Sequence, residues 1–253
     1  YGVAPHSLRA VSVENLRSYS ALFPTGPIHM HLAEQRLEVD EVQEHWGARP
    51  VEWALDNMEL DPRWCLVHCT QMTAQETVRL AQSGAVAGLC PITESSLGDG
   101  TFDAVRWMDS GGIIAVGSDS NIRVALSEEL RTLDYSQRLR DGTRASLASI
   151  EHSTGRRMFE GILKGGAQAS QRKTGRLEVG YWADMLTLDV GSELLWGRTE
   201  DTILDTWIFA GDDRLVSNVW SAGRHLVRDG KHIARKSIIA AYRQTVNALK
   251  DAI

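Results

Sequence analysis

Hydrophobic and polar positions in the first two thirds of the chain follow two alternating patterns. Four short apolar runs have the character of strands that are buried on both faces: residues 27–32, 64–68, 85–90 and 112–117. Four segments between and beside them carry apolar residues at helical spacing: residues 39–45, 50–58, 74–83 and 102–110. Strands that alternate with helices predict βαβ units and a parallel sheet.

The pattern changes after residue 119. Two longer helices are expected at residues 127–139 and 150–163, the second ended by Gly165 and Gly166. Short strands are expected farther on, at residues 175–180, 183–189, 215–222 and 225–228, followed by a turn at Asp229-Gly230 and a helix at 236–253. We therefore predict half of a βα barrel at residues 1–170, a β-rich module at 171–234 and a terminal helix at 235–253.

Charge and cysteine content exclude several classes of protein. The net charge is −6, so no basic excess is present to neutralise the phosphates of a nucleic acid or an anionic membrane. The longest apolar runs are far shorter than a membrane span. Three cysteines without a regular framework fit a reducing compartment. We expect a cytoplasmic protein without nucleic-acid or membrane partners.

Candidate chemistry lies at the carboxyl ends of the predicted strands, where parallel α/β folds place their active sites. His31 ends the first strand, His68 the second, and Asp119 follows the fourth. Each alone could be a satisfied histidine or a helix cap. Their combination at separate strand ends is typical of a zinc site, although Fe²⁺ or Mn²⁺ would also accept these ligands. Glu34, close behind His31, is placed to shuttle protons.

Two further patches leave alternatives open. His6 and Arg9 are three residues apart and would share one face of a helical turn, where they could grip a carboxylate, or they could be a solvated helix start. The glycine-containing segment at residues 90–100 could line a pocket or form a turn.

Three motifs resemble those of the amidohydrolase superfamily, in its deaminase and chlorohydrolase branch: His31-Leu32-Ala33-Glu34, Leu66-Val67-His68 and Gly117-Ser118-Asp119. The segments at residues 175–184 and 219–230 resemble strands of that superfamily's small β-sandwich domain. The resemblance implies an α/β fold, namely a partial (β/α)8 TIM-type metal-dependent hydrolase barrel with a small β-sandwich domain.

A second set of motifs resembles the formiminoglutamate deiminases within this superfamily. It comprises residues 4–11, 31–35, 93–100, 117–121 and 128–139. The implied reaction is hydrolysis of N-formimino-L-glutamate to N-formyl-L-glutamate and ammonia in histidine breakdown. The resemblance also implies a homodimer with one zinc ion per subunit.

The same resemblance assigns roles to individual residues. His31 and Asp119 would ligate the zinc, and Asp119 could also take the proton of the attacking water. Glu34 would protonate the departing nitrogen, and His68 would hold and polarise the attacking hydroxide. The carboxylates of the substrate would be bound by two further residues, His6 and Arg9.

The chain departs from the family pattern in one respect. The family's first barrel strand carries a His-x-His pair, whereas His29 and His31 match a later strand that supplies a single ligand. We therefore expect the first strands to be absent from this sequence, zinc affinity to be poor, and this polypeptide alone to be inactive and unstable. Two alternatives remain: a zinc deaminase acting on guanine, cytosine or an adenosine-type substrate, and an inactive truncated amidohydrolase.

Overall fold

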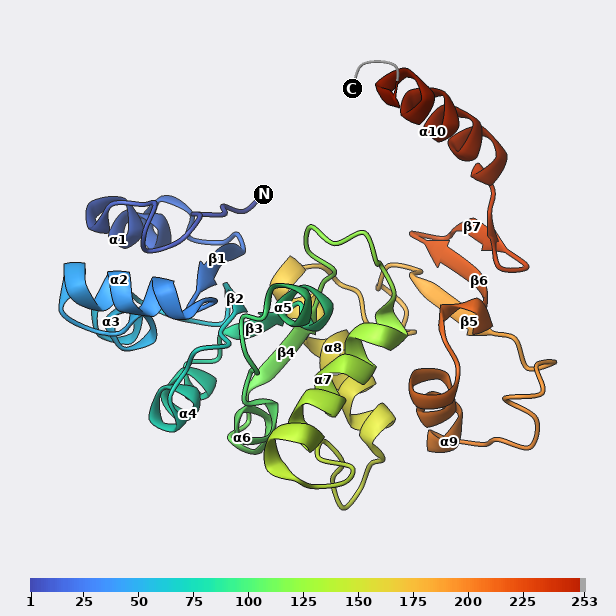
Figure 1. Cartoon of the computed structure of the whole chain (residues 1–253), viewed down its shortest axis with the longest axis horizontal. Coiled ribbons are helices and arrows are strands. Elements are labelled where there is room, and N and C mark those ends of the chain that lie inside the picture. Colours follow the sequence, from blue (N-terminus) through green and yellow to red (C-terminus); the bar gives the residue numbers. More distant parts are fainter. Residues whose placement is uncertain (251–253) are drawn as a thin grey trace.

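The computed structural model describes residues 1–250 and contains two sheets (Figure 1). The first is parallel, with the strand order β1-β2-β3-β4. Its strands are β1 (Ile28–Leu32), β2 (Trp64–His68), β3 (Val86–Leu89) and β4 (Ile113–Val116). The helices that connect them are α2 (Arg36–Trp46), α3 (Pro50–Asn57), α4 (Ala74–Gln82), α5 (Pro91–Leu97) and α6 (Ala104–Asp109). The predicted parallel α/β fold is confirmed.

The two faces of this sheet have different surroundings. Met30, Leu66, Ala87 and Ile114 lie on one face and are buried in a core shared with apolar side chains of the connecting helices. On the opposite face His29 is paired with Cys65, and His31 with Val67, as the alternation of side chains along a strand requires. The face that carries the histidines therefore lies away from this core, and Cys65, Val86 and Ala115 on it pack with Ala169 in a small cluster of their own.

The chain before β1 extends the sheet by a further parallel segment. Val3 forms a bridge with Ile28, and the His31 N–H donates to the His6 carbonyl at 3.0 Å. Helix α1 (Val13–Leu22), which the sequence did not predict, follows and begins where the Ser12 side chain accepts the N–H of Asn15. Residues 3–6 thus bring His6 to the edge of β1.

Helices α7 (Leu126–Asp141) and α8 (Thr154–Ser170) follow β4. The prediction that Gly165 and Gly166 end the second of these helices is wrong, since α8 continues to Ser170. The physical reason is packing, because a Cβ atom on Gly165 would overlap the carbonyl of Ile114 in β4. Glycine at this position lets the helix approach the strand closely.

The carboxyl-terminal end of α8 contacts the parallel sheet where its strands begin. The Gln168 amide donates to the carbonyls of Pro62 and Gly84, at 3.0 and 2.8 Å, just before β2 and β3 begin. The ring of His29 is hydrogen-bonded to the carbonyl of Ala169 at 2.8 Å. Helix α8 therefore covers the amino-terminal edge of the sheet, opposite the edge that carries the candidate chemistry.

The second sheet is antiparallel and has the order β5-β6-β7-β8. Its strands are β5 (Met185–Leu188), β6 (Val216–Ser221), β7 (Arg224–Arg228) and β8 (Lys231–His232). Between β5 and β6 lie α9 (Asp201–Asp205), a π-helical turn (Thr206–Ala210) and a 3-10 turn (Asp213–Leu215). The turn predicted at Asp229-Gly230 is confirmed, with both residues in the left-handed region.

The strand predicted at residues 175–180 is wrong: the segment forms turns and bends, because Gly175 and Gly180 have φ angles of +79° and +92°. The terminal helix is confirmed as α10 (Arg235–Lys250), which projects away from both sheets and buries none of its side chains (Figure 1). Residues 251–253 of the predicted helix lie outside the described residues. The division of the chain at residues 170 and 234 stays a prediction.

Among residues 1–250, no helix combines the length and the apolar composition that crossing a membrane would require.

The close packing of α8 on β4 gives a paired test. Gly165→Ala should lower the free energy of unfolding by about 1–3 kcal/mol, because the added methyl group must displace the Ile114 carbonyl. Gly166→Ala meets no atom within 4 Å, and in a helix it should raise the free energy of unfolding by about 0.5–1 kcal/mol. Urea unfolding of the two variants measures both values, and equal effects would show that the predicted overlap is absent.

Candidate active site

The carboxyl ends of β1 and β2 and the residues after β4 bring three predicted side chains together. The rings of His31 and His68 are nearly parallel, with their centroids 5.7 Å apart. The Nε2 atom of His68 lies 3.9 Å from Oδ2 of Asp119. Two imidazoles and a carboxylate from three strand ends thus share one small volume, although their roles as ligands or catalysts stay predictions.

The backbone at these strand ends is held in an unusual conformation. Ala33, His68, Cys69 and Asp119 all have φ angles between +52° and +72°, the left-handed region that non-glycine residues rarely adopt. Such conformations persist where the surrounding structure enforces them, and they cluster at functional sites. Here they turn the chain sharply at the strand ends that carry the candidate residues.

Glu34 is the second carboxylate near His68. Its Oε1 atom lies 3.6 Å from Nε2 of His68. The turn that carries it is fixed by Glu38, whose buried carboxylate accepts the N–H groups of Ala33 and Glu34 at 2.9 and 2.8 Å. Burial raises the pKa of the Glu34 carboxyl above its ordinary value, and the charge of Asp99 acts in the same direction, although His68 opposes it. A raised pKa suits a carboxyl that must carry and release a proton.

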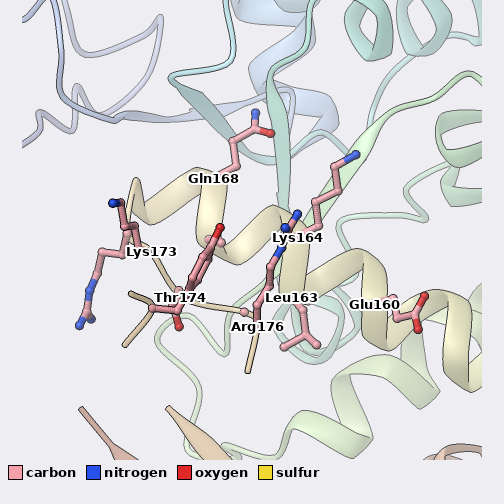
Figure 2. A pocket seen from close by; sticks show the side chains of 11 residues that line it. Glu160, Leu163, Lys164, Gln168, Lys173, Thr174 and Arg176 are labelled. Carbon is pink, nitrogen blue, oxygen red and sulfur yellow. The ribbon is translucent and has the colours of Figure 1, made fainter. Parts of the chain in front are cut away.

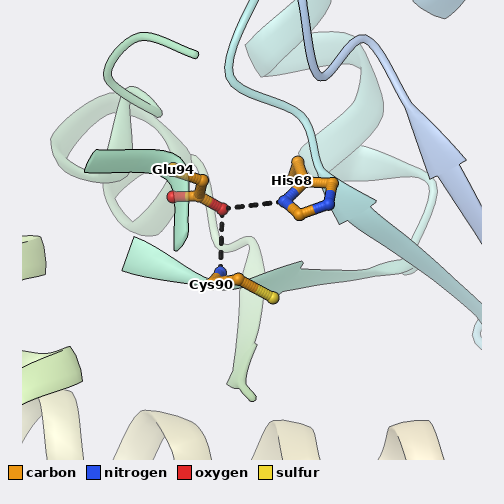
Figure 3. A group of neighbouring side chains, drawn as sticks. All are labelled: His68, Cys90 and Glu94. Carbon is orange, nitrogen blue, oxygen red and sulfur yellow. Dashed lines mark hydrogen bonds and ion pairs between the residues drawn. The ribbon is translucent and has the colours of Figure 1, made fainter. Parts of the chain in front are cut away.

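His68 is the most enclosed of these groups, with 1% of its surface exposed. Its Nδ1 atom lies 3.3 Å from Oε1 of Glu94, and the same oxygen accepts the Cys90 N–H at 2.8 Å (Figure 3). Burial by itself lowers the pKa of His68, but the hydrogen bond to Glu94 and the charges of Glu34 and Asp119 outweigh it and raise the pKa overall. The imidazole is therefore surrounded by carboxylates on both of its nitrogens.

His31 and Asp119 have the donor chemistry of a divalent metal site. The Nδ1 atom of His31 is hydrogen-bonded at 2.8 Å to the carbonyl of His6, which can only accept, so Nε2 keeps a free lone pair. One oxygen of Asp119 accepts the Ser120 N–H at 2.6 Å, and the other faces His68. These residues fit zinc, but they would be two of the three protein ligands that a catalytic zinc usually has.

A second group of possible metal donors consists of His68, Cys90 and Glu94, whose donor atoms lie within 4.8 Å of one another (Figure 3). Burial, reinforced by the charge of Glu94, raises the pKa of the Cys90 thiol above its usual range, which favours the neutral thiol over the thiolate that binds metals. The Glu94 oxygen already takes part in two hydrogen bonds. We therefore interpret this group as a hydrogen-bonding network around His68.

The sequence did not reveal the role of Glu94. The segment at residues 90–100 was expected to be a loop that lines a pocket or forms a turn, but it contains α5, which begins at Pro91 and ends before Gly98 in the left-handed region. Proline at the first helical position and glycine after the last are the local signals that could have indicated this helix. Nothing in the spacing could show that its Glu94 reaches a residue 26 positions away.

The two predicted substrate-binding residues have different surroundings. His6 is exposed, and the centroid of its ring lies 5.0 Å from that of His31. The guanidinium of Arg9 donates to Glu41 in α2 at 3.2 Å, and about a third of its side chain is exposed. The structure therefore brings His6 to the site, while Arg9 is engaged in an ion pair with α2.

A basic hollow lies elsewhere on the molecule. A cavity of about 530 Å³ at the end of α8 is lined by Lys164, Arg172, Lys173 and Arg176, together with Gln168 (Figure 2). Because Gln168 binds the carbonyls before β2 and β3, this hollow is at the amino-terminal edge of the parallel sheet. It is not part of the site around His68.

Comparison with known proteins identifies the family. The model of the amidohydrolase family matches residues 1–226. The chain belongs to the amidohydrolase family. The solved structure of an amidohydrolase from Brucella melitensis superposes with a TM-score of 0.92 and is 44% identical, covering 98% of this chain and 55% of that one. An adenosine deaminase from Xanthomonas campestris, solved with bound zinc, has a TM-score of 0.86 over 99% of this chain and 57% of its own, but at 23% identity it shows the fold alone.

Two curated relatives of this amidohydrolase carry names that refer to an activity. A formimidoylglutamate deiminase from Pseudomonas aeruginosa is 43% identical over 99% of this chain and 56% of its own length. A 5-methylthioadenosine/S-adenosylhomocysteine deaminase from Halobacterium salinarum is 32% identical over 73% of this chain and 43% of its own. The chain spans about half the length of the curated relatives it matches.

The buried carboxyl of Glu129 in α7 gives a pH test of the packing around α5. Burial raises its pKa to about 7, even though it accepts the Ile92 N–H at 2.9 Å. A carboxyl whose pKa is higher in the folded than in the unfolded state binds its proton more tightly when folded. Stability should therefore fall as the pH rises from about 5 to 7, by up to about 3 kcal/mol.

Glu129→Gln is the matched variant, since its amide oxygen can still accept the Ile92 N–H. Urea unfolding between pH 5 and 8 should show a shallower pH dependence for Glu129→Gln than for the unsubstituted chain, with the variant relatively more stable at pH 8. Identical pH dependences would mean that Glu129 titrates normally.

Proposed function

We propose that this chain forms one side of the active site of an enzyme that hydrolyses N-formimino-L-glutamate to N-formyl-L-glutamate and ammonia. The observation that carries the proposal is the placement of Glu34 and Asp119 at 3.6 and 3.9 Å from one nitrogen of His68. The similarity to a formimidoylglutamate deiminase over 99% of the chain supports the choice of substrate.

The reaction adds water to the formimino carbon and breaks the bond from that carbon to the terminal nitrogen. A divalent metal bound with the help of His31 and Asp119 would lower the pKa of water and so make it a better nucleophile at neutral pH. Glu34 delivers the proton of its carboxyl to the departing nitrogen and is reprotonated by the hydroxyl group of the tetrahedral adduct as the new carbonyl forms. The nitrogen receives its second proton from Asp119 and leaves as ammonia. His68 orients the attacking oxygen through Nε2, and Asp119 takes up the proton that the water loses.

We propose zinc as the metal, because imidazole and carboxylate donors on rigid strand ends suit it. Iron(II) and manganese(II) accept the same donors. We also propose that the enzyme works in the cytoplasm, since Cys65, Cys69 and Cys90 are free and buried and form no disulfide framework.

Deamination of a nucleoside is the second candidate function. The 32% identity to a 5-methylthioadenosine/S-adenosylhomocysteine deaminase supports it. The ion pair of Arg9 with Glu41 also favours it, because a guanidinium held by a protein carboxylate is less available to a substrate carboxylate. A dicarboxylate substrate requires Arg9 to leave Glu41 or to bind in the same network.

A segment exchange tests the function of these residues directly. In the Pseudomonas aeruginosa deiminase, the stretch that matches this chain is replaced by the chain itself. The exchanged enzyme should release ammonia from N-formimino-L-glutamate and not from 5-methylthioadenosine. In this enzyme Glu34→Gln should lower kcat by about 100-fold or more, because the amide cannot protonate the departing nitrogen.

Glu41→Gln serves as the control in the same enzyme, since it removes a carboxylate that contacts Arg9 and none of the groups around His68. It should leave kcat within about threefold, because it changes no group that transfers a proton, and any effect through Arg9 on binding of the substrate carboxylates should appear in KM alone. Preference for 5-methylthioadenosine in a folded, zinc-loaded exchanged enzyme would exclude the proposed substrate. Full activity of Glu34→Gln would exclude the proposed proton donor.

A further inference from the structure

We propose that Glu94 is a positioning residue that fixes the tautomer and orientation of His68, and that helix α5 holds His68 and the Asp119 loop in register. The effect on turnover rests on the proposed function, whereas the effect on the imidazole does not. Glu94 lies in one of the segments that resemble formiminoglutamate deiminases, but the resemblance assigns it no role, and it is 4% exposed.

The proton positions follow from the hydrogen-bonding capacity of the groups. An ionised carboxylate oxygen only accepts, and Oε1 of Glu94 already accepts the Cys90 N–H. The 3.3 Å contact with Nδ1 of His68 is therefore a hydrogen bond only if Nδ1 carries the proton. In the neutral ring, Nε2 then keeps a lone pair directed at the space between Glu34 and Asp119. Without an acceptor at residue 94, no hydrogen bond would favour the tautomer that has its proton on Nδ1.

Helix α5 also binds the loop that carries Asp119. The Thr93 hydroxyl donates to the carbonyl of Ser118 at 3.2 Å, and the side-chain amide of Asn121 donates to the same hydroxyl at 3.3 Å. Thr93 and Glu94 are adjacent, so one helical turn is attached both to the end of β2 and to the loop after β4. This turn is anchored on α7 by the hydrogen bond from the Ile92 N–H to Glu129 at 2.9 Å. The distance between His68 and Asp119 is thus set through α5.

A purely structural role is the competing explanation, because Glu94 also accepts the Cys90 N–H at the start of the helix. The two explanations differ in what each substitution should do. Glu94→Gln keeps an oxygen that can accept from both partners, whereas Glu94→Met keeps the length of the side chain but removes the acceptor. If the role of Glu94 is structural, the substitutions should change stability alone. If Glu94 is a positioning residue, they should also change which nitrogen of His68 carries the proton.

Nitrogen NMR of the full 253-residue chain, with ¹⁵N in the histidine rings, reports the tautomer without any substrate. Unsubstituted protein and Glu94→Gln should show the proton on Nδ1 of His68, and Glu94→Met should shift the population toward Nε2. The matched control is Glu76→Gln, since Glu76 is also buried and accepts the Thr73 N–H at 2.7 Å in the first turn of α4. It should lower stability and leave the His68 signals unchanged.

Kinetics in the segment-exchanged deiminase supply the second readout. Glu94→Met should lower kcat by about 10- to 100-fold, the usual effect of losing a partner that orients an active-site imidazole, with KM changed less than about threefold. Glu94→Gln should restore most of the loss. Thr93→Val should lower kcat without changing the His68 tautomer, because it loosens only the Asp119 loop.

A proton on Nε2 of His68 in the unsubstituted chain, at a pH at which the ring is neutral, would overturn the proposal, even if Glu94→Met failed to fold. So would a folded Glu94→Met variant that keeps both the tautomer and kcat. Absence of N-formimino-L-glutamate turnover in the parent exchanged enzyme would contradict the proposed function instead, and it would leave the tautomer result unaffected.

Discussion

The site depends on the parallel register that places Leu32 of β1 opposite His68 of β2. Parallel strands in register end at the same edge of their sheet, so the residues at and just after those ends are held within a few ångströms of one another. His31, Glu34 and His68 come from two neighbouring strand ends, and Asp119 follows β4 at the same edge. A shift of one residue in this register would turn His31 toward the helix-covered core.

The protonation of the groups in the site reflects an excess of carboxylates over positive charges. Glu34, Glu94 and Asp119 all surround His68, and the described residues around this imidazole include no lysine or arginine that pairs with it. Burial raises the pKa of the Glu34 carboxyl, whereas the pKa of His68 is raised, against the effect of burial, by its hydrogen bond to Glu94 and by the charges of the surrounding carboxylates. A divalent cation held by His31 and Asp119 would supply the missing charge.

The elements that can be predicted from the sequence are those whose structure depends on their own residues alone. The four parallel strands were found because each is a continuous apolar run, and the long helices because their apolar positions recur at helical spacing. The positions of His31, His68 and Asp119 at strand ends followed from those strands. Helix α5 was missed because it has seven residues, too few for a periodic signal.

The features that the sequence could not show depend on contacts between distant residues. The end of α8 was placed too early because the glycines there serve packing against Ile114, which local propensity cannot reveal. The engagement of Arg9 with Glu41 joins residues 32 positions apart, and that of Glu94 with His68 joins residues 26 apart. Such contacts exist only once the sheet has formed.

We propose that His31 and Asp119 bind one divalent cation, and that His68 lies beside this cation without binding a metal together with Cys90 and Glu94. Anomalous diffraction at the zinc edge from crystals of the segment-exchanged deiminase tests this most directly. We expect zinc at about 2.0–2.2 Å from Nε2 of His31 and from a carboxylate oxygen of Asp119. Zinc bound instead by His68, Cys90 and Glu94, with His31 free, would contradict it.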